Sequence, residues 1–222
     1  MSVIVEDGIR RMYVDREDVF YYLTVANEPY VQAEMPEGCA EGILRGLYKV
    51  RAATEPGRRT AAALLRQRLD PVRGAARPGV ACGVRRGWSA ERRRAGTSSP
   101  RRRRRRALEH AAPARDPRVP YFRQALDAEP WPIVAASDYM KTLPLTLATW
   151  APDGLHALGT DGFGRSETRE SLRRFFEVDA EPICVAALER VSPGARRSSC
   201  AACRTRSRSF GLDPGKPDPT TV

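Results

Sequence analysis

The sequence predicts an α/β protein organised around a largely parallel sheet. Short apolar runs alternate with segments of helical period, which is the pattern of strands connected by helices. No apolar run approaches the roughly 20 residues that a membrane span requires. Two arginine-rich blocks interrupt the alternation, so we expect the fold to be incomplete at those positions.

The first fifty residues carry ordinary folding signals. Residues 3–13 predict a helix, because Val5, Ile9 and Met12 recur at spacings of four and three. Residues 18–26 are rich in β-branched and aromatic side chains, which favours a buried strand.

A loop and a helix–strand pair complete this part of the chain. Residues 27–38 contain the Pro and Gly typical of loops, and residues 41–50 predict a short helix that runs into a strand. The N-terminus has neither the long apolar core nor the small-residue cleavage site of a signal peptide, so we expect a cytoplasmic protein.

Residues 57–115 have a different composition, dominated by Arg, Ala, Gly, Pro and Ser. The first fifty of them hold 17 Arg and two acids, Asp70 and Glu91, a net +15 that leaves −4 for the rest of a chain whose total is +11. Residues 61–69 are compatible with one or two helical turns. So few large apolar side chains cannot offset the entropy of ordering, and we expect this block to be disordered.

Ordinary composition returns after this block. Residues 120–128 predict a short amphipathic helix, and residues 131–139 predict a buried strand with a polar exit. Residues 142–150 predict a helix, in which Pro144 is tolerated only in the first turn. Residues 155–166 predict a short strand that enters a glycine-rich loop.

Residues 166–179 carry the clearest helix signal. Ser166 or Thr168 is a suitable N-cap, and acidic side chains occupy the first turn. Glu170 and Arg174 have the spacing and orientation of a stabilising pair. The apolar stripe consists of Leu172, Phe175 and Phe176.

The end of the chain repeats the contrast between ordinary and arginine-rich sequence. Residues 182–190 form a short continuous apolar run, which predicts another buried strand. Residues 190–208 contain six Arg and no acid, and we expect them to be disordered. Residues 210–222 are ordinary in composition again.

The six consecutive arginines at 101–106 are a candidate phosphate clamp. Trp88 is the only aromatic residue of the block that is available to stack on a base, and no nucleic-acid-binding fold is recognisable. Specific nucleic-acid binding is therefore disfavoured, whereas non-specific binding to polyanions is expected.

The cysteines and histidines form no site pattern. Five cysteines give no even disulfide framework, and we expect reduced thiols. Cys200 and Cys203 have the spacing of half a zinc site or a redox pair, but no second pair lies at a suitable distance. His110 and His156 fit no ligand pattern, and His156 is interpreted as a strand-end residue rather than a general base. The cysteines are Cys39, Cys82, Cys184, Cys200 and Cys203.

Two polar loops offer further candidates. Residues 159–166, GTDGFGRS, lead to a helix N-terminus suited to anion binding. The favoured alternative is a tight turn in which Asp161 or Arg165 ties the loop to a neighbouring domain or subunit. Acid pairs that could act in general acid–base catalysis are interpreted as solvated. These acids are Asp15, Glu17 and Asp18, and Glu34 and Glu37 around Pro36.

The ordinary segments, taken together, resemble a known family. The motifs NEPY, MPEG, RVPY, SDYMK and TDGFGRS occur here in the order found in the C-terminal part of the homodimeric bacterial pyruvate dehydrogenase (acetyl-transferring) component. This family belongs to the thiamine-diphosphate-dependent, transketolase-like superfamily. The resemblance covers residues 2–56 and 117–189 and extends to 210–222.

The resemblance implies an incomplete transketolase C-terminal-like domain, with a mostly parallel sheet and flanking helices, preceded by the end of a pyrimidine-binding-type domain. The implied parts are the tail of the thiamine-binding middle domain (1–36), a linker and the start of the C-terminal domain (37–56), the Arg-rich block (57–115), the transketolase C-terminal-like domain (116–189), and a second block with the tail (190–222).

The departures from the family coincide with the two arginine-rich blocks. In the family, the stretch after GLYK holds a strand, a helix and a second strand, and residues 57–115 have about the length that it requires. Equal length with unrelated content, and arginine without lysine, lead to the hypothesis of compensated frameshifts in a GC-rich gene.

The family decarboxylates pyruvate on thiamine diphosphate with Mg²⁺ and reductively acetylates the lipoyl group of dihydrolipoyl acetyltransferase, as a homodimer. Its diphosphate and metal sites and its activating glutamate lie upstream of the part that this sequence resembles. We therefore assign no catalytic, cofactor-binding or metal-binding residue here, and expect the chain alone to bind neither cofactor and to be inactive. The alternative is a small basic protein that binds nucleic acid or another polyanion through residues 57–115.

Overall fold

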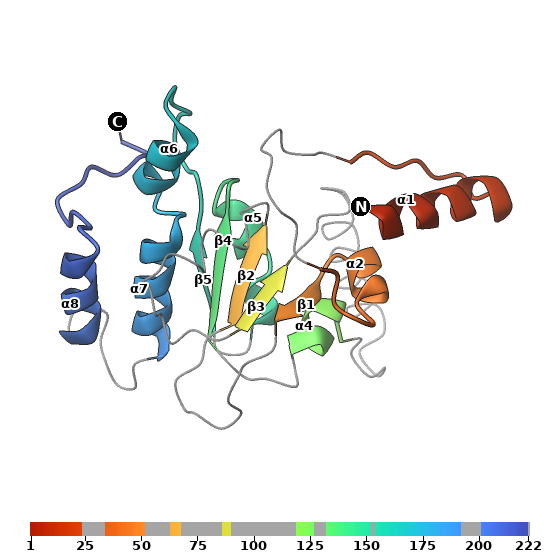
Figure 1. The fold of residues 1–222 in the computed structure, drawn as a ribbon, viewed down its shortest axis with the longest axis horizontal. Coiled ribbons are helices and arrows are strands. Elements are labelled where there is room, and N and C mark those ends of the chain that lie inside the picture. The colour runs from red at the N-terminus through yellow and green to blue at the C-terminus, as the bar shows by residue number, and fades with distance from the viewer. Residues whose placement is uncertain are drawn as a thin grey trace, which may run out of the picture.

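A five-stranded sheet with helices on both faces forms the centre of the protein (Figure 1). The computed structural model describes residues 1–23, 34–51, 63–67, 86–89, 119–126, 132–151, 154–191 and 201–221. The strands are β1 (Tyr48–Arg51), β2 (Ala63–Gln67), β3 (Arg86–Ser89), β4 (Ile133–Ser137) and β5 (Leu155–Leu158).

The sheet has the order β1-β3-β2-β4-β5 and is mostly parallel, as predicted. Strand β2 pairs in parallel with both β3 and β4, and β4 pairs in parallel with β5. Only β1, at one edge, runs antiparallel to its neighbour β3 among these described strands. A mixed α/β fold with a small parallel sheet is therefore confirmed.

Helices precede, cover and follow this sheet. The helices are α1 (Ser2–Ile9), the π-helical turn η1 (Arg10–Val14), α2 (Ala40–Arg45), α4 (Tyr121–Leu126), α5 (Thr142–Leu145), the 3₁₀ turn η2 (Ala148–Trp150), α6 (Arg169–Phe175), α7 (Ala180–Val191) and α8 (Ala201–Ser209). Within the described parts of the chain, no helix is both long and apolar enough to cross a membrane.

Strand β4 is the centre of the hydrophobic core, and every one of its five residues is buried. Val134 and Ala136 pack on one face with Leu158 and residues of α6 and α7. On the opposite face, Ile133 and Ala135 pack with side chains of α4 and the α5–η2 segment. This alternation follows from the two-residue period of a strand. Helices therefore pack on both faces of the sheet at β4, as in an α/β/α sandwich.

Several predicted elements are confirmed. They are the helix within residues 3–13, the helix–strand pair within 41–50, the helix within 120–128, the strand within 131–139, the helix within 142–150, the strand at the start of 155–166 and the helix within 166–179. Thr168 is the N-cap of α6, because its side chain accepts a hydrogen bond from the Ser171 backbone N–H. Pro144 lies in the single turn of α5, where its missing N–H leaves no helical bond unmade.

The prediction of a buried strand at 182–190 is wrong, because these residues belong to helix α7. Ala180, Ile183 and Ala187 are buried at helical spacing, and Pro182 lies in the first turn, where a helix tolerates proline. Helix α7 packs on β4 on one side and contacts α8 on the other. A helix covered on both sides loses its polar face, so its sequence resembles a buried strand.

The prediction of disorder across residues 57–115 and 190–208 is wrong where the structure describes these blocks. Residues 63–67 form strand β2, not helical turns, residues 86–89 form β3, and α8 starts inside the second block. Every non-proline residue has a backbone donor and acceptor, so a strand can join a sheet with few large side chains. Strand β2 pairs in parallel with β4, with Leu65 opposite Ala135, and this backbone pairing stabilises the strand. The rest of both blocks lies outside the described residues.

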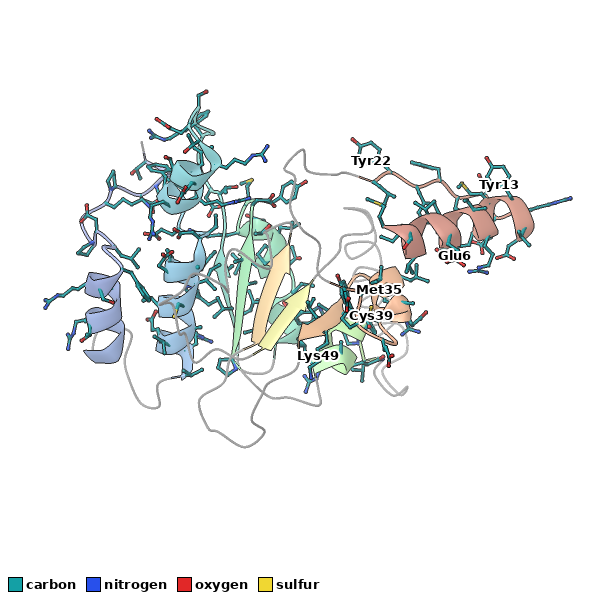
Figure 2. The ribbon with its side chains drawn as sticks, viewed as in Figure 1. Glu6, Tyr13, Tyr22, Met35, Cys39 and Lys49 are labelled. Carbon is teal, nitrogen blue, oxygen red and sulfur yellow. The ribbon has the colours of Figure 1, made fainter. Side chains whose placement is uncertain are left out.

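The predicted strand at 18–26 is absent from its described part, residues 18–23. Tyr21 packs against α1 near Gly8, whereas Phe20 and Tyr22 are exposed, and Tyr22 projects away from the helices in Figure 2. The aromatic residues here anchor an extended arm on one side only. Strand propensity therefore does not lead to strand pairing, which needs a neighbouring backbone.

Candidate functional site

The loops that follow β4 and β5 lie together at the carboxyl end of the parallel sheet, where α/β proteins commonly bind ligands. The Thr160 backbone N–H donates to the Tyr139 carbonyl oxygen at 3.0 Å. The Thr160 hydroxyl donates to the Asp138 carbonyl oxygen at 2.9 Å. These bonds join the motif SDYMK to the motif TDGFGRS.

Asp161 makes the strongest polar connection between the two loops. Its Oδ1 accepts a hydrogen bond from the Lys141 backbone N–H at 2.8 Å, and its Oδ2 lies 3.4 Å from the Lys141 Nζ. Asp161 therefore anchors the loop, but to a neighbouring loop of the same sheet and not to a neighbouring domain or subunit as expected. A carboxylate engaged in this way is a structural group rather than a free general base.

Glycine is required at two positions of this loop. A Cβ on Gly159 would lie 2.5 Å from the Tyr139 carbonyl oxygen and 2.8 Å from the Lys141 backbone nitrogen. Gly162 has a φ of +88°, and its Cβ would lie 2.1 Å from the Pro219 carbonyl oxygen. The C-terminal tail thus packs directly against the glycine-rich loop.

The C-terminal tail is fixed to α6 by Lys216. The Lys216 Nζ donates to the Phe175 carbonyl oxygen, lies 3.5 Å from the Glu177 carboxylate and sits 5.1 Å from the centre of the Phe175 ring. The Arg165 guanidinium lies over the same ring at 4.5 Å. Sequence reasoning identified the tail as ordinary chain but carried no signal for this contact, 41 residues away in the sequence.

A partly buried ionic cluster lies at the junction of α6 and α7. The Arg174 guanidinium is 3.0 Å from the Asp179 carboxylate and 3.3 Å from the Glu181 carboxylate. Burial, together with the like charge of Glu181, raises the pKa of Asp179 to about 6, although Arg174 opposes the shift. The cluster borders the core and connects two helices, which suits a structural and pH-sensitive role.

The anion-binding interpretation of residues 159–166 is not supported by the helix that follows. Helix α6 has only seven residues, and the Thr168 hydroxyl already accepts the Ser171 N–H at 3.3 Å. The tight-turn interpretation accounts for the contacts of the loop. Phe163 at its tip is exposed and marks a surface rather than a cavity.

The N-terminal acids pair with arginines of α1 and η1. Asp15 accepts a hydrogen bond from Arg10 at 2.6 Å, and Glu17 accepts hydrogen bonds from Arg11, which lower the pKa of the Glu17 carboxyl. Asp7 accepts a hydrogen bond from the Tyr21 hydroxyl at 2.6 Å. These pairs hold the arm against the helix, and Asp15 and Glu17 are nevertheless exposed, as expected for solvated side chains. Residues Asp18, Glu34 and Glu37 are exposed or at the surface, as expected for solvated side chains.

The cysteine prediction needs one correction. Cys184 in α7 is disulfide-bonded, so the expectation of reduced thiols is wrong for this residue. An odd number of cysteines excludes only a framework that pairs all of them. Cys39 is free and buried between α1 and α2. Candidates outside the described side chains are Cys82, Cys200, Cys203, His110, Trp88 and the arginines at 101–106.

The described residues do not fit a thiamine diphosphate or Mg²⁺ site. Across the described ranges, no group of three His, Cys, Asp or Glu side chains is arranged to hold a metal ion. His156 lies within β5, opposite Val134 of β4. The described polar groups of the β4 and β5 loops bond to one another, so this arrangement positions the two loops.

Comparisons with known proteins agree on one family. A family model described as the pyruvate dehydrogenase E1 component middle domain matches residues 1–33. The pyruvate dehydrogenase E1 component of Cupriavidus necator is 34% identical over 230 residues, covering 100% of this chain and 25% of that protein. The Mycobacterium tuberculosis and Escherichia coli K12 relatives are 40% and 41% identical over 201 and 198 residues, each covering 85% of this chain and 21% of the relative.

The extent of these matches limits what they imply. The chain spans about a quarter of the length of the relatives with which it aligns. A short portion of the Cupriavidus necator relative therefore aligns with the whole chain, including the region that contains the arginine-rich blocks.

Proposed function

The chain is homologous to part of the homodimeric bacterial pyruvate dehydrogenase E1 component, and we propose that it serves as the C-terminal portion of such an enzyme. In this proposal, residues 1–36 end the middle domain and residues 116–189 belong to the transketolase C-terminal-like domain. The observation that carries the proposal is the alignment of the entire chain with a quarter of the Cupriavidus necator relative.

The proposed role is structural completion of the enzyme. Pyruvate decarboxylation and reductive acetylation of lipoyl groups would be performed only by an assembly that contains the rest of the protein. Thiamine diphosphate supplies the electron sink for decarboxylation when it is bound. The described residues of this chain support the role by holding the β4 and β5 loops together through Thr160 and Asp161.

The homodimer and the dihydrolipoyl acetyltransferase are proposed as partners of the assembled enzyme only. The isolated chain should bind neither thiamine diphosphate nor Mg²⁺ and should not turn over pyruvate. A basic polyanion-binding function stays a prediction based on the net +15 of its arginine-rich block. Retention on DNA-cellulose with a steep salt dependence and competition by one specific sequence would favour that alternative.

Complementation in trans tests the proposal. The Cupriavidus necator relative, truncated where its similarity to this chain begins, is produced together with the full chain. Pyruvate-dependent reduction of an artificial electron acceptor is then measured. We expect activity from the pair and none from either part alone. Activity of the chain alone, or a stable but inactive pair, would contradict the proposal.

We also propose that residues 57–115 and 190–208 arose by reading-frame changes. Arginine without lysine in the first block, and an alignment that covers the whole chain with both blocks included, support this origin. The coding DNA of both blocks is to be translated in the other two frames. The proposal predicts an apolar-periodic α/β sequence in one of them, and it fails if neither frame shows one.

A further inference from the structure

Helix α1 has two different faces. One face is packed: Ile4 is buried with Cys39 and Ile43 of the α2 region, and Tyr21 closes over Gly8. This face also holds Asp7, which is buried and accepts the Tyr21 hydroxyl hydrogen bond. The helix is therefore firmly anchored to the rest of the protein on this side.

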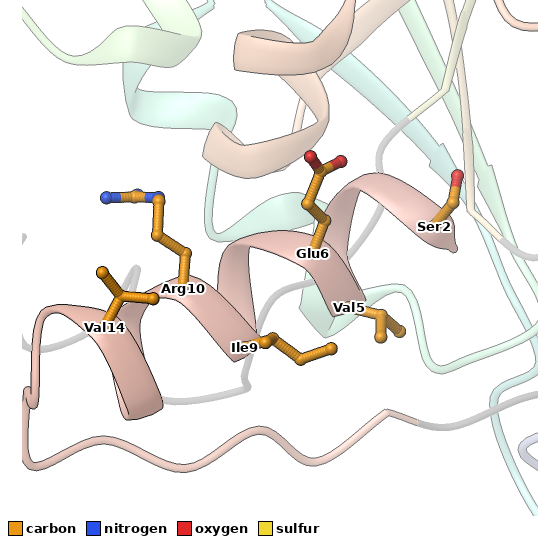
Figure 3. A pocket seen from close by; sticks show the side chains of 6 residues that line it. All are labelled: Ser2, Val5, Glu6, Ile9, Arg10 and Val14. Carbon is orange, nitrogen blue, oxygen red and sulfur yellow. The ribbon is translucent and has the colours of Figure 1, made fainter.

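The other face of α1 carries apolar side chains that are open to solvent. Val5 is 44% exposed, Ile9 53% and Val14 72%. Together with Ser2, Glu6 and Arg10, these side chains line one open hollow of about 460 Å³. Figure 3 shows the six side chains along α1 and η1. A helix with apolar side chains on two opposite faces is typical of one that is covered on both sides.

The π-helical turn η1 extends this apolar stripe. Ile9 and Val14 are five residues apart, about 1.4 turns of a regular α-helix, which would place them on different sides. The Asp15 backbone N–H donates instead to the Arg10 carbonyl oxygen at 2.9 Å, an i→i+5 bond. The extra residue in the turn brings Val14 to the same hollow as Val5 and Ile9.

We infer that the stripe of Val5, Ile9 and Val14 is a docking surface for the remainder of a pyruvate dehydrogenase E1 middle domain. Residues 1–33 match the model of that domain, and the chain accounts for only a quarter of the Cupriavidus necator relative. The occupant presents apolar side chains to the stripe, whose exposed members line the hollow. This inference rests on the proposed function, because both place the chain in an E1 assembly.

A chimera tests the docking surface. The aligned quarter of the Cupriavidus necator relative is replaced by the full chain, and Ile9→Cys is introduced both there and in the chain alone. The rate of reaction with a maleimide is measured above the background of the native cysteines. We expect Ile9→Cys to react at least tenfold more slowly in the chimera than in the chain alone.

Val119→Cys is the matched control, since Val119 is 45% exposed and lies outside α1. Its reaction rate should differ less than twofold between the two proteins. Equal reactivity of Ile9→Cys in the chimera and the chain alone would overturn the inference. If Ile9→Cys is protected from maleimide in the chimera but the chimera does not turn over pyruvate, docking is supported and the proposed function is rejected. If the chimera turns over pyruvate but Ile9→Cys is not protected, the proposed function is supported and docking is rejected.

If Ile9→Cys disturbs folding of the isolated chain, thermal unfolding of the chimera provides a second readout. Ile9→Glu places a charge in the docked stripe and should lower the melting temperature of the chimera by several degrees. Tyr13→Glu is its control, because Tyr13 is 76% exposed and does not line the hollow. An equal shift for both variants would contradict docking at the stripe.

Discussion

Gly159 and Gly164 lie five residues apart in one loop, and substitution by alanine should affect them in opposite directions. A Cβ at Gly159 would lie 2.5 Å from the Tyr139 carbonyl oxygen and 2.8 Å from the Lys141 backbone nitrogen. A Cβ at Gly164 would meet no atom within 4 Å. Neither glycine has a positive φ, so the comparison isolates the effect of space.

The expected magnitude follows from the contacts that Gly159→Ala disturbs. Overpacking against backbone atoms costs about 1–3 kcal/mol. Displacement of the two loops also weakens the Thr160–Tyr139 and Lys141–Asp161 hydrogen bonds, each of which contributes about 1 kcal/mol. We expect Gly159→Ala to lower the free energy of unfolding by about 2–4 kcal/mol.

Gly164→Ala should instead raise the free energy of unfolding by about 0.4–1 kcal/mol, because alanine allows the unfolded backbone fewer conformations than glycine does. Urea unfolding followed by tryptophan fluorescence measures both variants against the unsubstituted chain. If Gly159→Ala is neutral, or if both variants are destabilised equally, the close joining of the β4 and β5 loops is refuted.

The remaining predictions concern α6 and the ionic cluster. The pKa of Asp179 is raised to about 6, so its contribution to stability is complete below about pH 4 and is lost as the pH rises through 6. Asp179→Asn should flatten this decline, which unfolding at four pH values from 4 to 7 measures; an unchanged profile would reject the assignment. Thr168→Ala removes the N-cap and should cost about 1 kcal/mol, whereas Thr168→Ser should restore most of it in the same urea assay. Equal losses for both Thr168 variants would argue against a capping role.

The elements that the sequence predicted correctly carry local signals. Helix α6 has a cap at Thr168 and apolar side chains at helical spacing, and all of these lie within one short segment. Strand β4 is a short apolar run that ends in a polar residue, Ser137. Each signal depends on nearest neighbours in the chain, which a sequence displays directly.

The elements that were missed depend on distant neighbours. Helix α7 is apolar on two sides because both β4 and α8 contact it, and the sequence does not show either contact. Strand β2 is stabilised by backbone pairing with β3 and β4, which needs no large side chains. Composition alone therefore gave the wrong structure at both places.

The same distinction applies to the candidate site. The sequence offered Asp161 or Arg165 as an anchor to a neighbouring domain or subunit, but the partner of Asp161 is Lys141, which lies 20 residues earlier in the loop after β4. The pKa shift of Asp179 arises from burial against the core and from Glu181, and neither is visible as a motif. Interactions and pKa shifts that depend on loop pairing and burial can be identified only from the folded structure.

Pyruvate turnover by a repaired chimera tests the central claim, that this chain is the C-terminal portion of an E1 enzyme. The chain replaces the aligned quarter of the Cupriavidus necator relative, with residues 57–115 and 190–208 taken from that relative. The claim predicts a kcat/KM within about tenfold of the unaltered relative, since a factor of ten corresponds to only about 1.4 kcal/mol of transition-state stabilisation. A folded, dimeric chimera whose kcat/KM is lower by about a thousandfold or more would contradict it.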